Sequence, residues 1–170
     1  SAKDVILYIL QQLSVKGGVN KIIEYTGEGL KELSLTDRAT ICNMGAELGA
    51  TTSVFPTDEI TKEYLIQQGR EEDYVELKAD EDATYDEEIT VDLSRLVPLT
   101  AKPHSPDAVV PVSELKGMKI NQVVIGSCTN SSLPDMLKAA KILKGRRVAT
   151  HVSLVIAPGS SSILAMLSKC

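Results

Sequence analysis

VVIGSCTNSSLPDM, residues 123–136, is the stretch of sequence that decides the fold. It begins with a short apolar run rich in β-branched residues, which predicts a buried strand. Residues 126–132 are all small or polar, and Pro134 and Asp135 then favour the first turn of a helix. We therefore expect Cys128 on a strand-to-helix loop, close to a helix N-terminus.

The chemistry of Cys128 follows from this position. Backbone N–H groups, hydroxyls and the helix dipole favour a thiolate there. A thiolate in such a loop acts as a nucleophile or as a metal ligand. His104 and His151 are distant in sequence and serve as its base only if folding brings them near, so the metal-ligand interpretation is favoured. An inert cysteine in a small-residue turn is the alternative that the spacing leaves open.

The C-terminal part repeats the strand–helix pattern. Strands are predicted over 121–126 and 152–156, each followed by a helix, over 134–144 and 161–169. This order predicts a right-handed crossover and a parallel sheet. The loops GSCTNSS and APGSSS would then lie at the same sheet edge, where ligands bind. Residues 160–162, all serines, either offer groups to an anion or only cap the next helix.

The first half of the chain also alternates helices and strands. Residues 2–14 carry apolar side chains at helical spacing, and residues 20–27, NKIIEYTG, are a predicted strand. Thr36 or Asp37 can cap a helix that runs to about Leu48. Further expected elements are a strand over 51–55, a helix from Thr57 or Asp58 to about Gln68, and a strand over 87–96.

On the helix that ends near Leu48, Asn43 and Glu47 are four residues apart. This spacing places an amide and a carboxylate side by side on one helical face. From the residues alone, a solvated helix face is the favoured explanation of this pair, and a binding site is the alternative.

Two segments separate the informative stretches. Residues 71–88 contain ten acidic residues, which predicts a solvated surface segment rather than a metal or basic-partner patch. Residues 98–111 contain four prolines and are the best candidate for a linker or a domain boundary. We therefore expect two small α/β lobes, residues 1–100 with Asn43 and Glu47, and residues 101–170 as the start of the next lobe, with the GSCTN loop.

Composition excludes several classes of protein. Of the 170 residues, 43% are apolar and 24% charged, as in ordinary globular proteins. The net charge of −5 argues against nucleic acid or a membrane surface as the main partner. No apolar run reaches the length of a membrane span, and the N-terminus does not have the pattern of a signal peptide. Three cysteines without framework spacing suit a reducing compartment, so we expect a cytoplasmic protein.

Two motifs carry a resemblance to a known family. IGSCTNSS around Cys128, and ATICNMGAELGATTSVFP around Asn43 and Glu47, resemble motifs of the aconitase family, which also includes the large subunits of 3-isopropylmalate dehydratase. The resemblance implies an aconitase-like α/β fold. It further implies aconitate hydratase activity, a hydro-lyase reaction of the tricarboxylic acid cycle. The substrates would be the tricarboxylates citrate and isocitrate, interconverted through cis-aconitate.

The resemblance also implies roles for individual residues. Cys128 matches one of three thiolates that hold a 4Fe–4S cluster, and Asn43 and Glu47 match residues beside the iron and its bound hydroxyl or water. One iron without a protein ligand would bind substrate and act as a Lewis acid. Cys42 is interpreted as a small buried residue.

The sequence also departs from the family pattern. The family's Cys-x-x-Cys pair downstream of the PGS loop is absent, and Cys170 does not supply it. The family's catalytic serine, its substrate-binding arginines and the His and Asp residues of its first domain have no match either. We therefore expect an internal fragment that is inactive on its own and holds no cluster.

Three functions remain in consideration. The large subunit of 3-isopropylmalate dehydratase or homoaconitase is the alternative within the family. Ser131 and Ser132 after CTN, and TTSVFP after Ala50, favour aconitate hydratase instead. A non-catalytic anion-binding or regulatory module is the alternative from another class.

Overall fold

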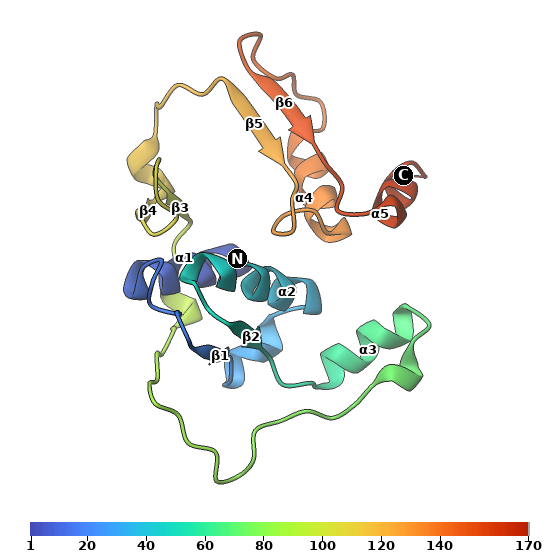
Figure 1. Cartoon of the computed structure of the whole chain (residues 1–170). Helices are drawn as coiled ribbons and strands as arrows, with labels where there is room; N and C mark the ends of the chain where they lie inside the picture. Colours follow the sequence, from blue (N-terminus) through green and yellow to red (C-terminus); the bar gives the residue numbers. More distant parts are fainter. Residues whose placement is uncertain (170) are drawn as a thin grey trace. The chain divides into compact units, whose positions relative to one another are not determined.

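Helix α1 (Ala2–Leu13) is the centre of the first half of the computed structural model, which describes residues 1–169 (Figure 1). Its apolar side chains recur at helical spacing and form one continuous face. Ile6 and Leu10 on this face are completely buried. The helix predicted over residues 2–14 is therefore confirmed, and it forms most of the hydrophobic core.

The chain divides into two units, which we call unit 1 (Ser1–Glu114) and unit 2 (Leu115–Cys170). The helices and strands of unit 1 are α1, β1 (Ile22–Glu24), α2 (Leu35–Asn43), β2 (Thr52–Val54), α3 (Glu59–Gln67), β3 (Leu99–Ala101) and β4 (Val109–Pro111). Its short 3₁₀ helices are η1 (Glu28–Glu32), η2 (Met44–Leu48), η3 (Glu71–Asp73) and η4 (Leu93–Arg95), and η5 (Val112–Leu115) ends at the division. Unit 2 contains β5 (Gln122–Ile125), α4 (Leu133–Leu143), β6 (Ser153–Ile156) and α5 (Ser161–Leu167).

Strands β1 and β2 form a parallel pair in unit 1, with Ile23 opposite Ser53. The connection between them contains α2, as expected for a parallel crossover. Both strands lie inside the ranges predicted from the sequence. Helix α3 begins after Asp58, whose side chain accepts a hydrogen bond from the backbone N–H of Thr61 at 3.1 Å, so the predicted cap is confirmed.

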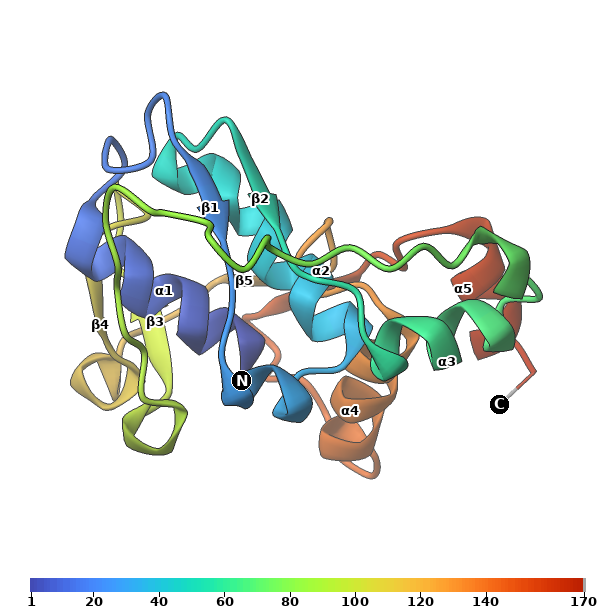
Figure 2. The same ribbon diagram turned by 90° about the horizontal axis from the view of Figure 1, so that it is seen from below.

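The proline-rich segment 98–111 is not a linker. Strands β3 and β4 form an antiparallel hairpin beside α1 (Figure 2). Asp4 of α1 accepts a hydrogen bond from the backbone N–H of Leu99 at 2.8 Å, and Gln11 donates one to the carbonyl of Val109 at 3.1 Å. These contacts with α1 place the hairpin in unit 1. The division between the units therefore follows residue 114, later than the expected boundary at residue 100.

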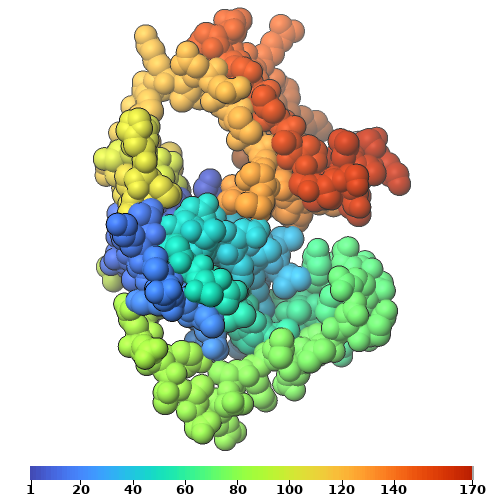
Figure 3. Space-filling model, in the orientation of Figure 1, coloured from blue at the N-terminus to red at the C-terminus, as the bar shows by residue number. Residues whose placement is uncertain are grey.

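The strand predicted over residues 87–96 does not form. Within the described part of the chain, the backbone of residues 86–91 makes no backbone hydrogen bond, and η4 follows directly. A strand requires a partner, and this segment lies along unit 1 without one. The preceding acidic residues, 71–88, are almost all exposed, as predicted, and Figure 3 shows this part of the chain in green on the surface.

Unit 2 follows the predicted order of strand, helix, strand and helix. Strands β5 and β6 pair in parallel, with Val124 opposite Val155. Inside this unit, Met136 of α4 and Ser131 are buried, whereas Val124 is 63% exposed. The predicted fold class is therefore confirmed: an α/β chain of two small units, the second with a parallel sheet.

Candidate functional site in two loops

The helix that carries Asn43 begins two or three residues earlier than predicted. Ser34, rather than Thr36 or Asp37, is its N-cap. The Ser34 hydroxyl accepts a hydrogen bond from the backbone N–H of Asp37 at 3.3 Å, and the Asp37 carboxylate accepts one from the backbone N–H of Ser34 at 3.1 Å. This reciprocal pair is a capping box, which satisfies two N–H groups at the helix start.

The same helix changes its geometry at the candidate site. Helix α2 ends at Asn43, and the next residues form the 3₁₀ helix η2, which Gly49 ends in the left-handed conformation at φ 74°. A 3₁₀ helix aligns residues three apart, so Asn43 and Glu47 do not stack as they would in an α-helix. A Cβ atom on Gly45 would overlap with Ser53 Oγ of β2, so glycine allows this turn to pack against the strand.

Asn43 and Glu47 lie in different surroundings. Asn43 is exposed and lines a small hollow of about 310 Å³, together with Cys42, Gly45 and residues 50–53. Glu47 is half-buried, and its Oε2 is buried without a hydrogen-bond partner among the described residues. Because a buried carboxylate oxygen ordinarily has a partner, this atom is a candidate acceptor for a bound group.

A buried arginine of α2 connects the segments that flank the candidate site. Arg38 of α2 is only 2% exposed. It donates hydrogen bonds to the carbonyls of Leu30 and Leu33, at 3.0 and 3.3 Å, and to the Asp58 carboxylate at 2.5 Å. Its guanidinium carbon lies 5.9 Å from the ring centroid of Phe55. Arg38 therefore ties the segment before α2 to the start of α3.

Two pKa values are shifted in and beside this network. The hydrogen bond from Arg38 holds the pKa of Asp58 below its usual value. Tyr25 of unit 1 stacks on Phe55, with the ring centroids 4.6 Å apart, and its burial, with a smaller contribution from Cys42, raises the pKa of its hydroxyl to about 12. The sequence pattern did not reveal this network, because a buried arginine inside a helix has no local signature.

Cys128 lies on the loop between β5 and α4, as predicted, and is exposed. Gly126 and Ser127 have φ values of 158° and 64°, and the backbone N–H of Asn130 donates to the Gly126 carbonyl at 3.2 Å. The turn is therefore tight, and Cys128 lies within it. Ser132 caps α4 through the backbone N–H of Asp135, at 3.3 Å.

The loop after β6 lies against this turn on both sides of Cys128. A Cβ atom on Gly126 would be 2.6 Å from the Ala157 carbonyl oxygen. The backbone N–H of Gly159 donates to the carbonyl of Ser131 at 3.3 Å, and a Cβ atom on Gly159 would overlap with Ser131 Oγ. The prediction that both loops meet at one sheet edge is confirmed. Ser160 caps α5, because its hydroxyl accepts a hydrogen bond from the backbone N–H of Ile163 at 3.2 Å.

The family is decided by the match of a family model described as the aconitase family (aconitate hydratase), which covers residues 1–118 and 113–169. The chain belongs to the aconitase family. It is 46% identical over 162 residues to the 3-isopropylmalate dehydratase large subunit 2 of Archaeoglobus fulgidus, covering 95% of this chain and 39% of that protein. With the 3-isopropylmalate dehydratase large subunit of Clostridium kluyveri it shares 44% identity over 169 residues, 99% of this chain and 40% of that protein.

A third relative is named for a different activity. The methanogen homoaconitase large subunit of Methanocaldococcus jannaschii is 40% identical over 177 residues, covering 99% of this chain and 42% of that protein. The chain thus spans about two fifths of the length of the curated relatives it matches. These names favour the dehydratase and homoaconitase alternative over aconitate hydratase, which the residues after CTN and Ala50 had favoured.

The iron–sulfur cluster implied by the aconitase family finds one suitable ligand here. Cys128 is an exposed thiol among hydroxyls, with Thr129 Oγ1 at 3.9 Å from its Sγ. Cys42 is half-buried against the Ser53 carbonyl, and burial raises the pKa of its thiol, which disfavours a thiolate. Residues 1–169 contain no group of three His, Cys, Asp or Glu residues placed to hold a metal. Cys170 lies outside the described residues.

The aconitase-family chain thus presents its predicted site residues on two separate units. Asn43 and Glu47 lie in unit 1, and Cys128 lies in unit 2. Their convergence in one active site stays a prediction. No helix of residues 1–169 is long and apolar enough to cross a membrane.

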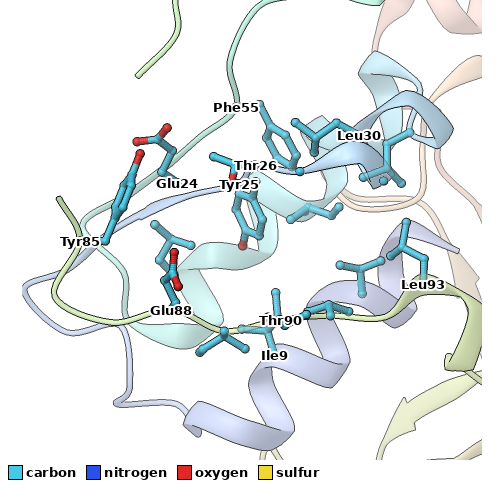
Figure 4. A pocket seen from close by; sticks show the side chains of 18 of the residues that line it. Ile9, Glu24, Tyr25, Thr26, Leu30, Phe55, Tyr85, Glu88, Thr90 and Leu93 are labelled. Atoms are coloured by element: carbon cyan, nitrogen blue, oxygen red, sulfur yellow. The ribbon is translucent and has the colours of Figure 1, made fainter. Parts of the chain in front are cut away.

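Unit 1 also contains a cavity that the sequence did not predict. Its volume is about 540 Å³, and it lies between α1, β1 and the extended segment 85–93 (Figure 4). Its floor is apolar, with Ile9, Phe55 and Leu93 among the lining residues. None of Asn43, Glu47 and Cys128 lines it.

Proposed function

We propose that the chain is a segment of the large subunit of a dehydratase that removes water from 3-isopropylmalate. The observation that carries this proposal is 46% and 44% identity, over nearly the whole chain, to large subunits named for that reaction. The term large subunit in these names also implies a small-subunit partner. Cys42 and Cys128 form no disulfide within residues 1–169, which suits a cytoplasmic enzyme.

In this proposal Cys128 holds one iron of a 4Fe–4S cluster. Its exposure and its position beyond the carboxyl end of a parallel strand support the assignment. When bound, such a cluster supplies a Lewis acid for the departure of hydroxide. The described residues provide one suitable cysteine ligand, so the remaining ligands would come from elsewhere in the enzyme.

Glu47 and Asn43 would act on the hydroxyl that leaves as water. Glu47 Oε2 is buried and has no partner among the described residues, so it can accept a hydrogen bond from that hydroxyl. In the reverse hydration it can receive a proton from the incoming water, and in dehydration it would return that proton to the departing hydroxide. Asn43 lines the adjacent hollow and can orient the same group through its amide. Gly45 and Ser53 hold the 3₁₀ turn that carries Glu47 against β2.

Two other substrates have support from specific observations. The M. jannaschii relative is named a homoaconitase, and its identity of 40% is close to that of the dehydratases. Ser131 and Ser132 after CTN, and TTSVFP after Ala50, resemble aconitate hydratase. All three substrates would be di- or tricarboxylates that lose water through the same residues.

The test is the substrate preference of the assembled enzyme, with both subunits and its cluster. We expect kcat/KM for 3-isopropylmalate to exceed the values for homocitrate and citrate. A higher kcat/KM for citrate would replace the proposal with aconitate hydratase, and a higher value for homocitrate would replace it with homoaconitase. Absence of turnover with all three would favour a non-catalytic binding module.

A further inference from the structure

Within residues 1–169, strand β1 has one edge without a partner strand. The carbonyl of Lys21 and the backbone N–H of Tyr25 form hydrogen bonds to the chain around β2, at 2.9 and 3.0 Å. Backbone groups point to alternate sides along a strand, so those of Ile22 and Glu24 point away from β2. That outer edge borders the cavity of unit 1.

A second extended segment borders the opposite side of the same cavity. Residues 87–91 and Leu93 line it, and the sequence EEITVDL of residues 87–93 has the alternation of a strand. In the structure this segment has no backbone partner from 86 to 91 among the described residues. A strand pattern without a paired strand is the expected result when the pairing element is missing.

The lining of the cavity between these two edges suits a bound β-strand. Apolar side chains of α1 and the core form its floor, and Ile89 at its margin is 40% exposed. Its rim is acidic, with the carboxylates of Glu24, Glu28, Glu87 and Glu88. Lys21 is the basic residue among the lining positions, and it is already paired with Glu87 at 2.6 Å. The rim therefore favours an occupant with lysine or arginine side chains.

We propose that a β-strand with alternating apolar and basic side chains occupies this cavity and pairs with β1 on one side and residues 86–91 on the other. The unit would then contain a continuous sheet of four strands. An inserted strand sits about 4.8 Å from each neighbour, which satisfies the backbone groups of both edges at once.

The occupant is a strand from the remainder of the large-subunit polypeptide, and this choice rests on the proposed function. The curated large subunits are more than twice as long as this chain, which covers 39% and 40% of the first two described above. A strand of the same polypeptide is present at high effective concentration, so a short pairing of few residues is sufficient.

Hydrogen exchange measured by mass spectrometry tests the proposal. The full-length large subunit alone is compared with the 170-residue chain, and segments 22–24 and 86–91 are followed. We expect exchange in the full-length subunit to be slower by on the order of a hundredfold, the usual effect of stable pairing. Residues 79–82, which are exposed and far from the cavity lining, serve as the control and should exchange rapidly in both proteins.

Other occupants produce different patterns. Protection that appears only after addition of the small subunit would overturn the proposal, as would protection of the 170-residue chain that rises with its own concentration. Equal, rapid exchange in both proteins would also overturn it. Within the full-length subunit, Glu24→Lys should speed exchange of 86–91 by about two- to fivefold, whereas Glu81→Lys should not. This pattern is independent of which substrate the enzyme prefers, so the two proposals fail separately.

Discussion

Replacement of Arg38 by methionine tests the buried network beneath the candidate site. Methionine retains much of the length and apolar surface of arginine but has no donors. The carbonyl of Leu33 would lose its charged partner, and leaving such a group unsatisfied costs about 1–3 kcal/mol. The carbonyl of Leu30 would lose the hydrogen bond from Arg38, worth about 1–2 kcal/mol, but would keep the one from the backbone N–H of Leu33 at 3.1 Å. Asp58 is 34% exposed and regains water, so it adds little. We expect the free energy of unfolding to fall by about 2–5 kcal/mol.

Urea unfolding followed by circular dichroism measures this change, and the m-value should stay constant. Arg70→Met is the matched control, because Arg70 and Asp73 form an exposed pair at 2.6 Å, 63% and 47% exposed. Loss of that pair should cost less than about 1 kcal/mol. Equal effects of the two substitutions would refute the argument that burial of Arg38 makes its contacts stabilising.

The same network has a pH signature. Because the pKa of Asp58 is lowered in the folded state, its contribution is present above the unfolded value of about 3.9 and is lost as the pH falls through the folded pKa. Arg38→Met should remove this part of the acid dependence. If the free energy of unfolding of the variant falls at low pH as it does in the wild type, Arg38 does not contribute to stability through Asp58.

Three further results are expected. Gly159→Ala should push the loop after β6 away from Ser131 and so change the alkylation rate of Cys128, which peptide mass spectrometry measures. A second substitution, Ser131→Gly, should restore the original rate. An unaltered rate in Gly159→Ala would contradict the contact. Glu47→Gln should lower kcat of the assembled enzyme by about 10²–10⁴-fold, and wild-type turnover would remove Glu47 from the site. Since the pKa of Tyr25 is raised to about 12, stability should be complete below pH ~10 and fall as the pH rises towards 12, and Tyr25→Phe should abolish this fall in alkaline unfolding experiments.

Local patterns predicted unit 2 well because its elements are specified locally. The apolar run before Gly126 and the helix start at Pro134 and Asp135 need no distant residue to be recognised. Parallel pairing follows from the crossover between the strands. The loop position of Cys128 was therefore predictable from the sequence, and the motif around it indicated the family.

Contacts between distant residues explain where the structure differs from the predictions made from the sequence. Prolines in 98–111 suggested a linker, but hydrogen bonds to Asp4 and Gln11 of α1 hold the segment as a hairpin. The helix through Asn43 tightens into a 3₁₀ turn where Gly45 meets Ser53, a contact that helical spacing does not show. The prediction of aconitate hydratase rested on a few residues beside the motifs. Similarity over the whole chain, which samples many more positions, favours the dehydratase and homoaconitase large subunits instead.

Iron content after replacement of single cysteines tests most directly whether the loop between β5 and α4 is the cluster-binding loop of this aconitase-family chain. The wild-type enzyme, Cys128→Ser and Cys42→Ser are loaded with iron and sulfide without oxygen, as the complete large subunit. Cys42 is the matched control, because it is half-buried and hydrogen-bonded to the Ser53 carbonyl. We expect Cys128→Ser to lose most of its bound iron and Cys42→Ser to retain it. Wild-type iron in Cys128→Ser would contradict the assignment of Cys128 as a ligand.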